Sequence, residues 1–117
     1  MKFIVEKKDN YTSVKVTEPK LDTHIALTLK SELILVAGSG EKNILLDISA
    51  CSYCDSSGLS AILVGNRLCK NEGGVFLVAG IQPAVERLIS ISQLDSVLNI
   101  SYNIDVAEET MISLLDK

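Results

Sequence analysis

The hydrophobic positions of this chain form two patterns that alternate along its length. Continuous apolar runs at 44–46 and 75–79 are typical of strands that are buried on both faces of a sheet. Shorter segments at 3–6 and 12–17 also have strand-forming composition, and Lys8-Asp9-Asn10 between them suits a hairpin turn. The pattern therefore predicts a hairpin followed by two buried strands.

Apolar residues spaced three and four positions apart predict helices between and after these strands. The first helix is capped by Asp22 or Thr23 and ends at Gly38, and the second begins near Asp55. We expect helices over about 23–37, 56–69 and 105–115, a shorter helix that starts at 83, and a weak strand at 98–100.

The order of these elements indicates one α/β domain that spans residues 1–117. Continuous apolar strands separated by a helix favour parallel pairing, with helices packed against the sheet. We expect a mixed sheet of four or five strands, with the helices mainly on one face and the short first strand at an edge. The runs 44–46 and 75–79 should be adjacent central strands.

Composition and charge argue against a nucleic-acid-binding surface, a membrane span and a signal peptide. The net charge is −4 and the basic residues are scattered, whereas a nucleic-acid surface needs clustered positive charge. No apolar run reaches the roughly 20 residues of a membrane span, and the charged N-terminal segment does not have the pattern of a signal peptide. We therefore expect a cytoplasmic protein that binds no nucleic acid directly.

The spacing of Cys51 and Cys54 is that of a Cys-x-x-Cys motif, which raises redox and metal chemistry as alternatives. A redox pair would need a helix start to lower its thiol pKa, but Asp55 and two serines occupy that position. A zinc site needs about four ligands, and the chain has three cysteines, one histidine and no second close pair. We expect reduced thiols, with no metal and no cofactor.

The segment Asp55-Ser56-Ser57-Gly58 stands where the second helix must begin. Asp and Ser are favoured at helix starts because their oxygens accept hydrogen bonds from backbone N–H groups that lack intrahelical partners. The same N–H groups and the helix dipole also favour phosphate. The serines can therefore be ordinary caps or a phosphorylation switch, and the residues alone leave both readings open.

The helix that follows is apolar on two sides. Leu59 and Ile62 lie on one side, and Val64 and Leu68 lie roughly opposite. Such a helix is either buried between layers or presents one side to a partner. Burial against its own neighbours is the simpler interpretation.

Taken together, these motifs resemble the STAS domains of anti-sigma-factor antagonists, and the resemblance covers nearly the whole chain. Its most specific element is Asp55-Ser56-Ser57-Gly58-Leu59, which matches the Asp-Ser-Ser/Thr-Gly-Leu motif of that family. Two departures are Pro19-Lys20, where the family often has Gly-Glu, and Gln93, where it commonly has Gly. The other matching segments are Leu21-Asp22 at the first helix, Gly73-Gly74 before a strand, Pro83-Ala84-Val85-Glu86-Arg87-Leu88, and Leu94-Asp95.

The resemblance implies a binding module controlled by phosphorylation, and not an enzyme. Family members of this type bind an anti-sigma factor that is also a serine kinase, and so regulate transcription that depends on the sigma factor. The kinase phosphorylates the first serine of the motif, here Ser56, and a PP2C-type phosphatase removes the phosphate. The residues that the resemblance places at the partner-binding surface are Asp22, Thr23, Asp55, Ser56, Ser57, Gly58 and Leu59. The alternative is a STAS scaffold, or a subunit of a larger assembly such as a transporter complex, in which Ser56 is never modified.

Overall fold

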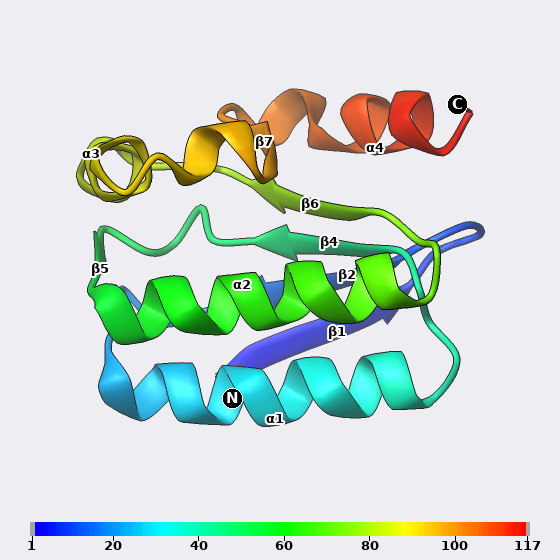
Figure 1. Cartoon of the computed structure of the whole chain (residues 1–117), viewed down its shortest axis with the longest axis horizontal. Helices are drawn as coiled ribbons and strands as arrows, with labels where there is room; N and C mark the ends of the chain where they lie inside the picture. The colour runs from blue at the N-terminus through cyan, green and yellow to red at the C-terminus, as the bar shows by residue number, and fades with distance from the viewer. Residues whose placement is uncertain (1, 117) are drawn as a thin grey trace.

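The computed structural model describes residues 2–116, which form an α/β fold around a five-stranded mixed sheet (Figure 1). The strand order is β1-β2-β4-β6-β7, with β1 antiparallel to β2 and the other neighbours parallel. The sheet strands are β1 (Phe3–Lys7), β2 (Thr12–Val16), β4 (Ile44–Asp47), β6 (Phe76–Ala79) and β7 (Asn99–Ser101). The helices are α1 (Thr23–Gly38), α2 (Ser56–Asn71), α3 (Pro83–Ile91) and α4 (Ala107–Leu115), with short 3-10 turns at η1 (Leu94–Ser96) and η2 (Ile104–Val106).

The N-terminal hairpin forms where its turn residues predict it. The backbone N–H of Lys8 donates to the carbonyl of Tyr11 at 2.8 Å and closes the turn. The register pairs Phe3 with Val16, so that their side chains share one face of the sheet. β1 lies at the edge of the sheet, as expected.

The two continuous apolar runs form the adjacent central strands β4 and β6, which pair in parallel, as predicted. Ile44 opposes Phe76, and both side chains are almost fully buried. The second strand begins at Phe76, one residue later than the apolar run itself. The sheet therefore has its most hydrophobic strands in the middle, where both faces are covered.

The helices lie mainly on one face of the sheet, as the sequence indicated (Figure 1). Residues of α1, α2 and α3 share one large apolar cluster with the side chains of that face. α2 packs so closely on β6 that a Cβ at Gly65 would lie 2.5 Å from the Phe76 ring. On the opposite face, α4 contributes Ala107 and Met111 to a smaller cluster with Leu45.

One pairing was not predicted from the sequence. β3 (Lys20–Leu21) and β5 (Tyr53–Cys54) form a separate two-stranded parallel ladder, in two segments for which the sequence predicts no strand. Two residues are too few to show strand periodicity, and each strand pairs with a segment far away in the chain. The ladder is nevertheless important, because α1 and α2 begin directly after it.

The end of α3 explains one departure from the family pattern. Gln93 has a φ of 61°, which lies in the left-handed region, and it is the only non-glycine residue of 2–116 with a positive φ. Glycine adopts this conformation without a steric cost, which accounts for the glycine common at this position in the family. Here Gln93 makes the same turn with a side chain.

Candidate functional site

The N-termini of α1 and α2 lie side by side because the short β3–β5 ladder joins the segments that precede them (Figure 1). Asp22 follows β3 and accepts a hydrogen bond from the N–H of Ile25 at 3.3 Å. Asp55 follows β5 and accepts one from the N–H of Gly58 at 3.0 Å. Of the two residues considered as caps for α1, Asp22 is therefore the N-cap, and Asp55 has the same role in α2.

The two serines that follow Asp55 differ in their surroundings. Ser56 is the first residue of α2, it is exposed, and its hydroxyl has no hydrogen-bond partner among residues 2–116. Ser57 is half-buried, and its Oγ lies 3.2 Å from Thr23 Oγ1, at hydrogen-bonding distance. Neither serine serves as the N-cap, since Asp55 does. Ser56 is thus left with a free hydroxyl at the start of a helix.

Gly58 and Leu59 lie beneath this surface. A Cβ at Gly58 would be 2.7 Å from the Cys54 sulfur and closer still to the carbonyl oxygen of Leu21, so glycine allows α2 to start against β3. Leu59 is 7% exposed and belongs to the main apolar cluster. Both residues hold the helix start in place, and their contact with a partner remains a prediction.

A groove of about 440 Å³ runs between the first turns of α1 and α2, beside the two serines. The predicted site residues include Thr23, Ser56 and Ser57 of its lining but not Ala26, Leu27, Lys30 or Ser60. Helical spacing places Leu27 on the same side of its helix as Thr23, and Ser60 on the same side as Ser56, but it does not show that the two sides meet in a groove. Lys30 is the only basic residue in the lining, and it forms no ion pair within residues 2–116. We call this the serine groove; it is lined by Thr23, Ala26, Leu27, Lys30, Ser56, Ser57 and Ser60.

The cysteines next to the site are buried thiols. The Cys51 thiol donates to the Glu18 carbonyl at 3.3 Å, and the Cys54 thiol to the Asp55 carbonyl at 3.4 Å. Burial raises the pKa of Cys54 to about 12, and the nearby Asp55 carboxylate contributes in the same direction. Burial likewise raises the pKa of Cys51 to about 11. Both thiols are therefore protonated near neutral pH, and the thiolate is the form that reacts and binds metal.

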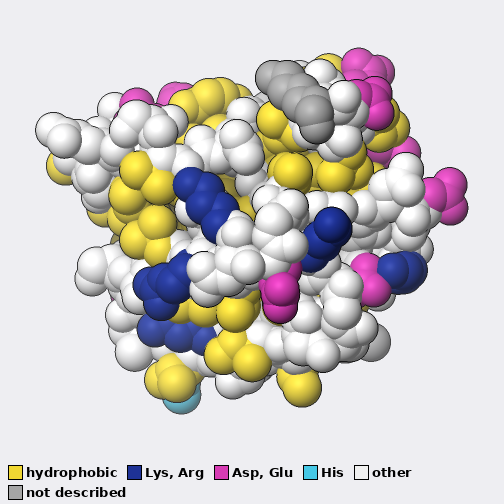
Figure 2. Space-filling view, turned by 45° about the vertical axis from the view of Figure 1, so that its right-hand side comes forward, with side chains coloured by type: hydrophobic (Ala, Val, Ile, Leu, Met, Phe, Trp, Pro, Cys, Tyr) yellow, Lys and Arg dark blue, Asp and Glu magenta, His cyan; other side chains and the backbone are white. Residues whose placement is uncertain are grey.

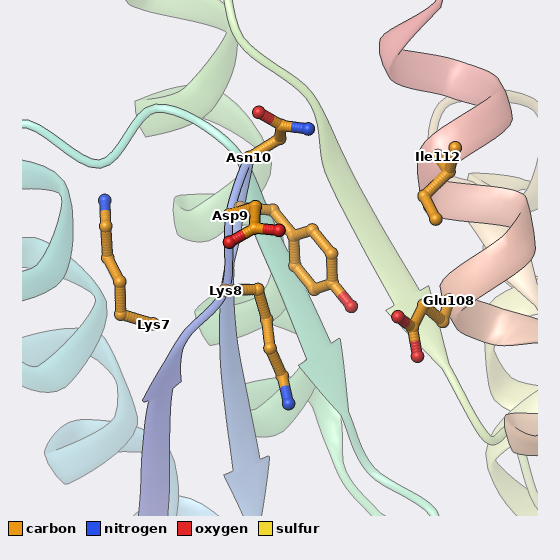
Figure 3. Close-up of a pocket in the computed structure, with 7 residues that line it drawn as sticks. Lys7, Lys8, Asp9, Asn10, Glu108 and Ile112 are labelled. Carbon is orange, nitrogen blue, oxygen red and sulfur yellow. The ribbon is translucent and has the colours of Figure 1, made fainter.

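A second hollow, of about 320 Å³, lies at the opposite end of the molecule from the serines, between the β1–β2 hairpin and α4. Figure 3 shows Glu108 and Ile112 on α4 facing Lys8 and Asp9 of the hairpin. Burial, and then the charge of Glu108, raise the pKa of Tyr11, which also lines this hollow. The hollow shares no lining residue with the serine groove and forms a separate feature.

Residues 2–116 contain no helix with the length and apolarity needed to cross a bilayer. Within the same range, no three His, Cys, Asp or Glu side chains are grouped as metal ligands would be.

Comparison with known proteins agrees with this architecture. The sequence model of the STAS domain matches residues 2–107, so the chain belongs to the STAS domain family. It is 26% identical over 102 residues to the anti-sigma-B factor antagonist of Bacillus subtilis (strain 168), covering 86% of this chain and 93% of that protein.

Two solved structures are similar at 25% identity and a TM-score of 0.81. The first is an anti-sigma factor antagonist from Mycobacterium paratuberculosis, for which 93% of this chain and 92% of the other are covered. The second is RsbS from Moorella thermoacetica with one serine replaced by glutamate, and both chains are covered completely. These similarities confirm the resemblance to STAS domains of the anti-sigma-factor antagonist type.

Proposed function

We propose that this chain is an anti-sigma-factor antagonist that binds an anti-sigma factor with serine kinase activity, and that phosphorylation of Ser56 ends this binding. The observation that carries the proposal is the free, exposed hydroxyl of Ser56 at the start of α2, beside the serine groove. The antagonist names of the relatives support the class of partner. The chain itself acts as a binding module and performs no catalysis.

The geometry is compatible with a phosphate on Ser56 in a fold that stays intact. The hydroxyl is exposed and unpaired, so its modification breaks no hydrogen bond within residues 2–116. The first backbone N–H groups of α2 have no intrahelical acceptor and can donate to phosphate oxygens. Lys30 supplies a positive charge in the same groove. These features would hold the phosphate at the surface of the domain.

The change that a partner meets is mainly electrostatic. A phosphate adds about −1.5 to −2 charges at neutral pH, next to the carboxylates of Asp55 and Asp22. An anti-sigma factor that fits the uncharged surface would lose affinity through repulsion and through the bulk of the phosphate. Since about 1.4 kcal/mol changes a dissociation constant tenfold, a few kcal/mol at this point is a sufficient switch.

The test compares three variants with each anti-sigma factor kinase of the source organism, using phosphate transfer and titration calorimetry. Ser56→Ala should bind as wild type does but accept no phosphate. Ser56→Asp should bind more weakly, although less so than the phosphoprotein, because it carries about one charge. Ser57→Ala is the matched control and should still be phosphorylated, since it leaves the Ser56 hydroxyl unchanged. Circular dichroism checks that each variant is folded.

Two results would contradict the proposal. Phosphate incorporated into Ser56→Ala at the wild-type rate would place the modification elsewhere, and equal affinity of folded Ser56→Asp would remove charge as the switch. Failure of all variants to bind any kinase would instead favour an unmodified STAS scaffold. If phosphate transfer is observed, we expect a PP2C-type phosphatase to remove the phosphate and restore binding.

A further inference from the structure

The outward side of α1 and α2 combines apolar and basic side chains. Leu27 and Ile34 are 65% and 54% exposed and lie two turns apart on the same side of α1. Lys30 lies between them at helical spacing, and Arg67 is exposed on α2, which packs along α1. Figure 2 shows Lys and Arg side chains next to hydrophobic ones on one side of the molecule. We call this surface the basic face; it consists of Leu27, Lys30, Ile34, Val64 and Arg67.

No residue of 2–116 covers the basic face or pairs with its charges. Neither Lys30 nor Arg67 forms an ion pair with a residue of 2–116. α1 is also hydrophobic on its outer side as well as its inner side, which is typical of a helix with packing partners on both sides. The surface therefore matches a partner that carries acidic and apolar groups.

Such a surface exists elsewhere on the same chain. α4 turns Ala107 and Met111 towards the sheet, so its other side points outwards. On that side Val106 is 44% exposed, and Ile112, which also borders the hollow beside Lys7 and Lys8 of the hairpin, is 47% exposed. Residues 104–116 contain four carboxylates and no Lys or Arg. We call this surface the acidic face; it consists of Asp105, Val106, Glu109, Ile112 and Asp116.

The two faces lie on opposite sides of the central sheet and cannot meet within one molecule. α1 and α2 belong to the large apolar cluster on one side, and α4 to the smaller cluster on the other. Figure 1 shows α4 separated from α1 and α2 by the strands. In Figure 2 most of the visible Asp and Glu side chains lie along the top and right of the view, whereas most of the Lys and Arg side chains lie towards its left and centre.

We propose that the basic face of one copy of this chain binds the acidic face of a second copy. The two faces complement each other in two ways. Exposed leucine and isoleucine meet exposed valine and isoleucine, and two cations without ion pairs meet a helix whose charged residues are all carboxylates. The two contacting surfaces are different, so the association is head-to-tail. In a pair, one copy therefore keeps a free acidic face and the other a free basic face, so the assembly continues as a ring or an open chain.

Sedimentation equilibrium of the unphosphorylated full-length chain tests this proposal. At low salt, the weight-average mass should rise by about two-fold or more between about 10 μM and 1 mM protein, the range expected of a weak interface. It should fall towards the monomer mass in about 0.5 M salt, because salt screens exposed charges. A wild-type chain that stays monomeric throughout would overturn the proposal.

Charge reversal identifies the surfaces. Lys30→Glu/Arg67→Glu makes both faces acidic, and Glu109→Lys/Asp116→Lys makes both basic, so each double variant alone should lose the rise in mass. An equimolar mixture of the two should regain it, because each acidic face then meets a basic face on the other variant. Association that survives in either variant alone, or a folded mixture that stays monomeric, would refute the assignment.

Control variants carry the same charge changes away from both faces. Lys2→Glu/Arg87→Glu alters the net charge as the first double variant does, and Glu72→Lys/Glu86→Lys as the second does. All four of these control residues are exposed. Both control variants should keep the wild-type rise in mass, and a loss there would show that overall charge, and not these faces, governs association. Circular dichroism confirms the fold of every variant.

Discussion

Two serines adjacent in sequence have different chemistry in this structure because of one residue in another helix. Thr23 lies 34 positions away from Ser57 in the chain, yet its hydroxyl is 3.2 Å from the Ser57 hydroxyl. Ser56 makes no such hydrogen bond within residues 2–116 and is exposed. The motif could be found from the sequence, whereas the difference between its two hydroxyls depends on how α1 packs beside α2.

The thiol of Cys54 should be unreactive in the native protein. Burial, and secondarily Asp55, raise its pKa to about 12, so little thiolate exists at pH 8. We expect iodoacetamide to modify Cys54 at least about 100-fold more slowly in native protein than in urea-unfolded protein, where the pKa returns to about 8.5. Peptide mass mapping after timed alkylation at pH 8 measures both rates.

The alkylation rate of Cys54 should also be measured in Asp55→Asn. It removes the carboxylate charge but keeps a side chain that can cap the helix. Because burial is the larger cause of the shift, the native rate should rise by less than about tenfold in this variant. Equal rates for native and unfolded wild-type protein would show that Cys54 is accessible and that its burial does not protect it.

At the scale of elements, the start of α2 depends on the close approach of that helix to β3. A Cβ at Gly58 would lie 2.7 Å from the Cys54 sulfur, so Gly58→Ala must push the helix away from the ladder. We expect it to lower the free energy of unfolding by about 1–3 kcal/mol, as overpacking does. Urea denaturation followed by circular dichroism measures the change.

Gly38→Ala is the matched control for this substitution. Gly38 lies at the end of α1, and apart from its chain neighbours and the backbone of its own helix no described atom lies within 4 Å of the position of an added Cβ. The control should leave stability unchanged or raise it by up to about 1 kcal/mol, because alanine favours helix more than glycine does. If both variants behaved alike, the contact with β3 would not be the cause.

The end of α3 offers a stabilising change. Gln93 has a φ of 61°, a conformation that costs residues with a side chain roughly 1 kcal/mol and glycine little. Gln93→Gly should therefore raise the free energy of unfolding by up to about 1 kcal/mol in urea denaturation. Ser92→Gly, one residue earlier at a φ of −80°, should instead lower it. A loss of stability in Gln93→Gly would mean that its side chain makes a stabilising contact.

The sequence predicted elements best where they carry their own periodic pattern. The hairpin and the central strands could be located because turn residues and apolar runs are local signals. The β3–β5 ladder has only two residue pairs and no such pattern, so it was missed. Thr23, Ser56 and Ser57 of the serine groove could be singled out because helix-start residues are recognisable, but Leu27 and Lys30 reach the groove only through the packing of α1 on α2.

For the whole molecule, the three buried thiols make stability sensitive to alkaline pH. Folding raises the pKa of Cys51 and Cys69 to about 11 and that of Cys54 to about 12, mainly through burial. Above pH 9 the unfolded chain loses these protons while the folded chain keeps them, so the equilibrium shifts towards unfolding. The thiols should leave stability almost unchanged below about pH 8. Stability should fall above about pH 9, by up to about 1.4 kcal/mol per pH unit for each thiol, until about pH 11 for Cys51 and Cys69 and about pH 12 for Cys54.

Urea denaturation at successive pH values measures this slope. Cys69→Ala removes one of the three groups, so its slope should be shallower by about one third if the three thiols contribute equally. Lysine and tyrosine residues also titrate in this pH range, but they are the same in wild type and in Cys69→Ala. A difference in slope between the two proteins is therefore due to the Cys69 thiol. An identical slope in the two proteins would assign the alkaline loss to other groups.

The small β3–β5 ladder also has a consequence for motion. It holds together the starts of α1 and α2 through two residue pairs, whereas the main sheet has five strands and a buried interior. Such a short unit can open by local unfolding at a much lower free energy than the whole domain, and its amides then exchange hydrogen with solvent early. A partner that contacts both helix starts would slow that exchange by recognising them only while they are joined. The paired starts of α1 and α2 would thus assemble and come apart while the five-stranded sheet stays folded. A partner that needs both helix starts would therefore bind only molecules in which the ladder is formed.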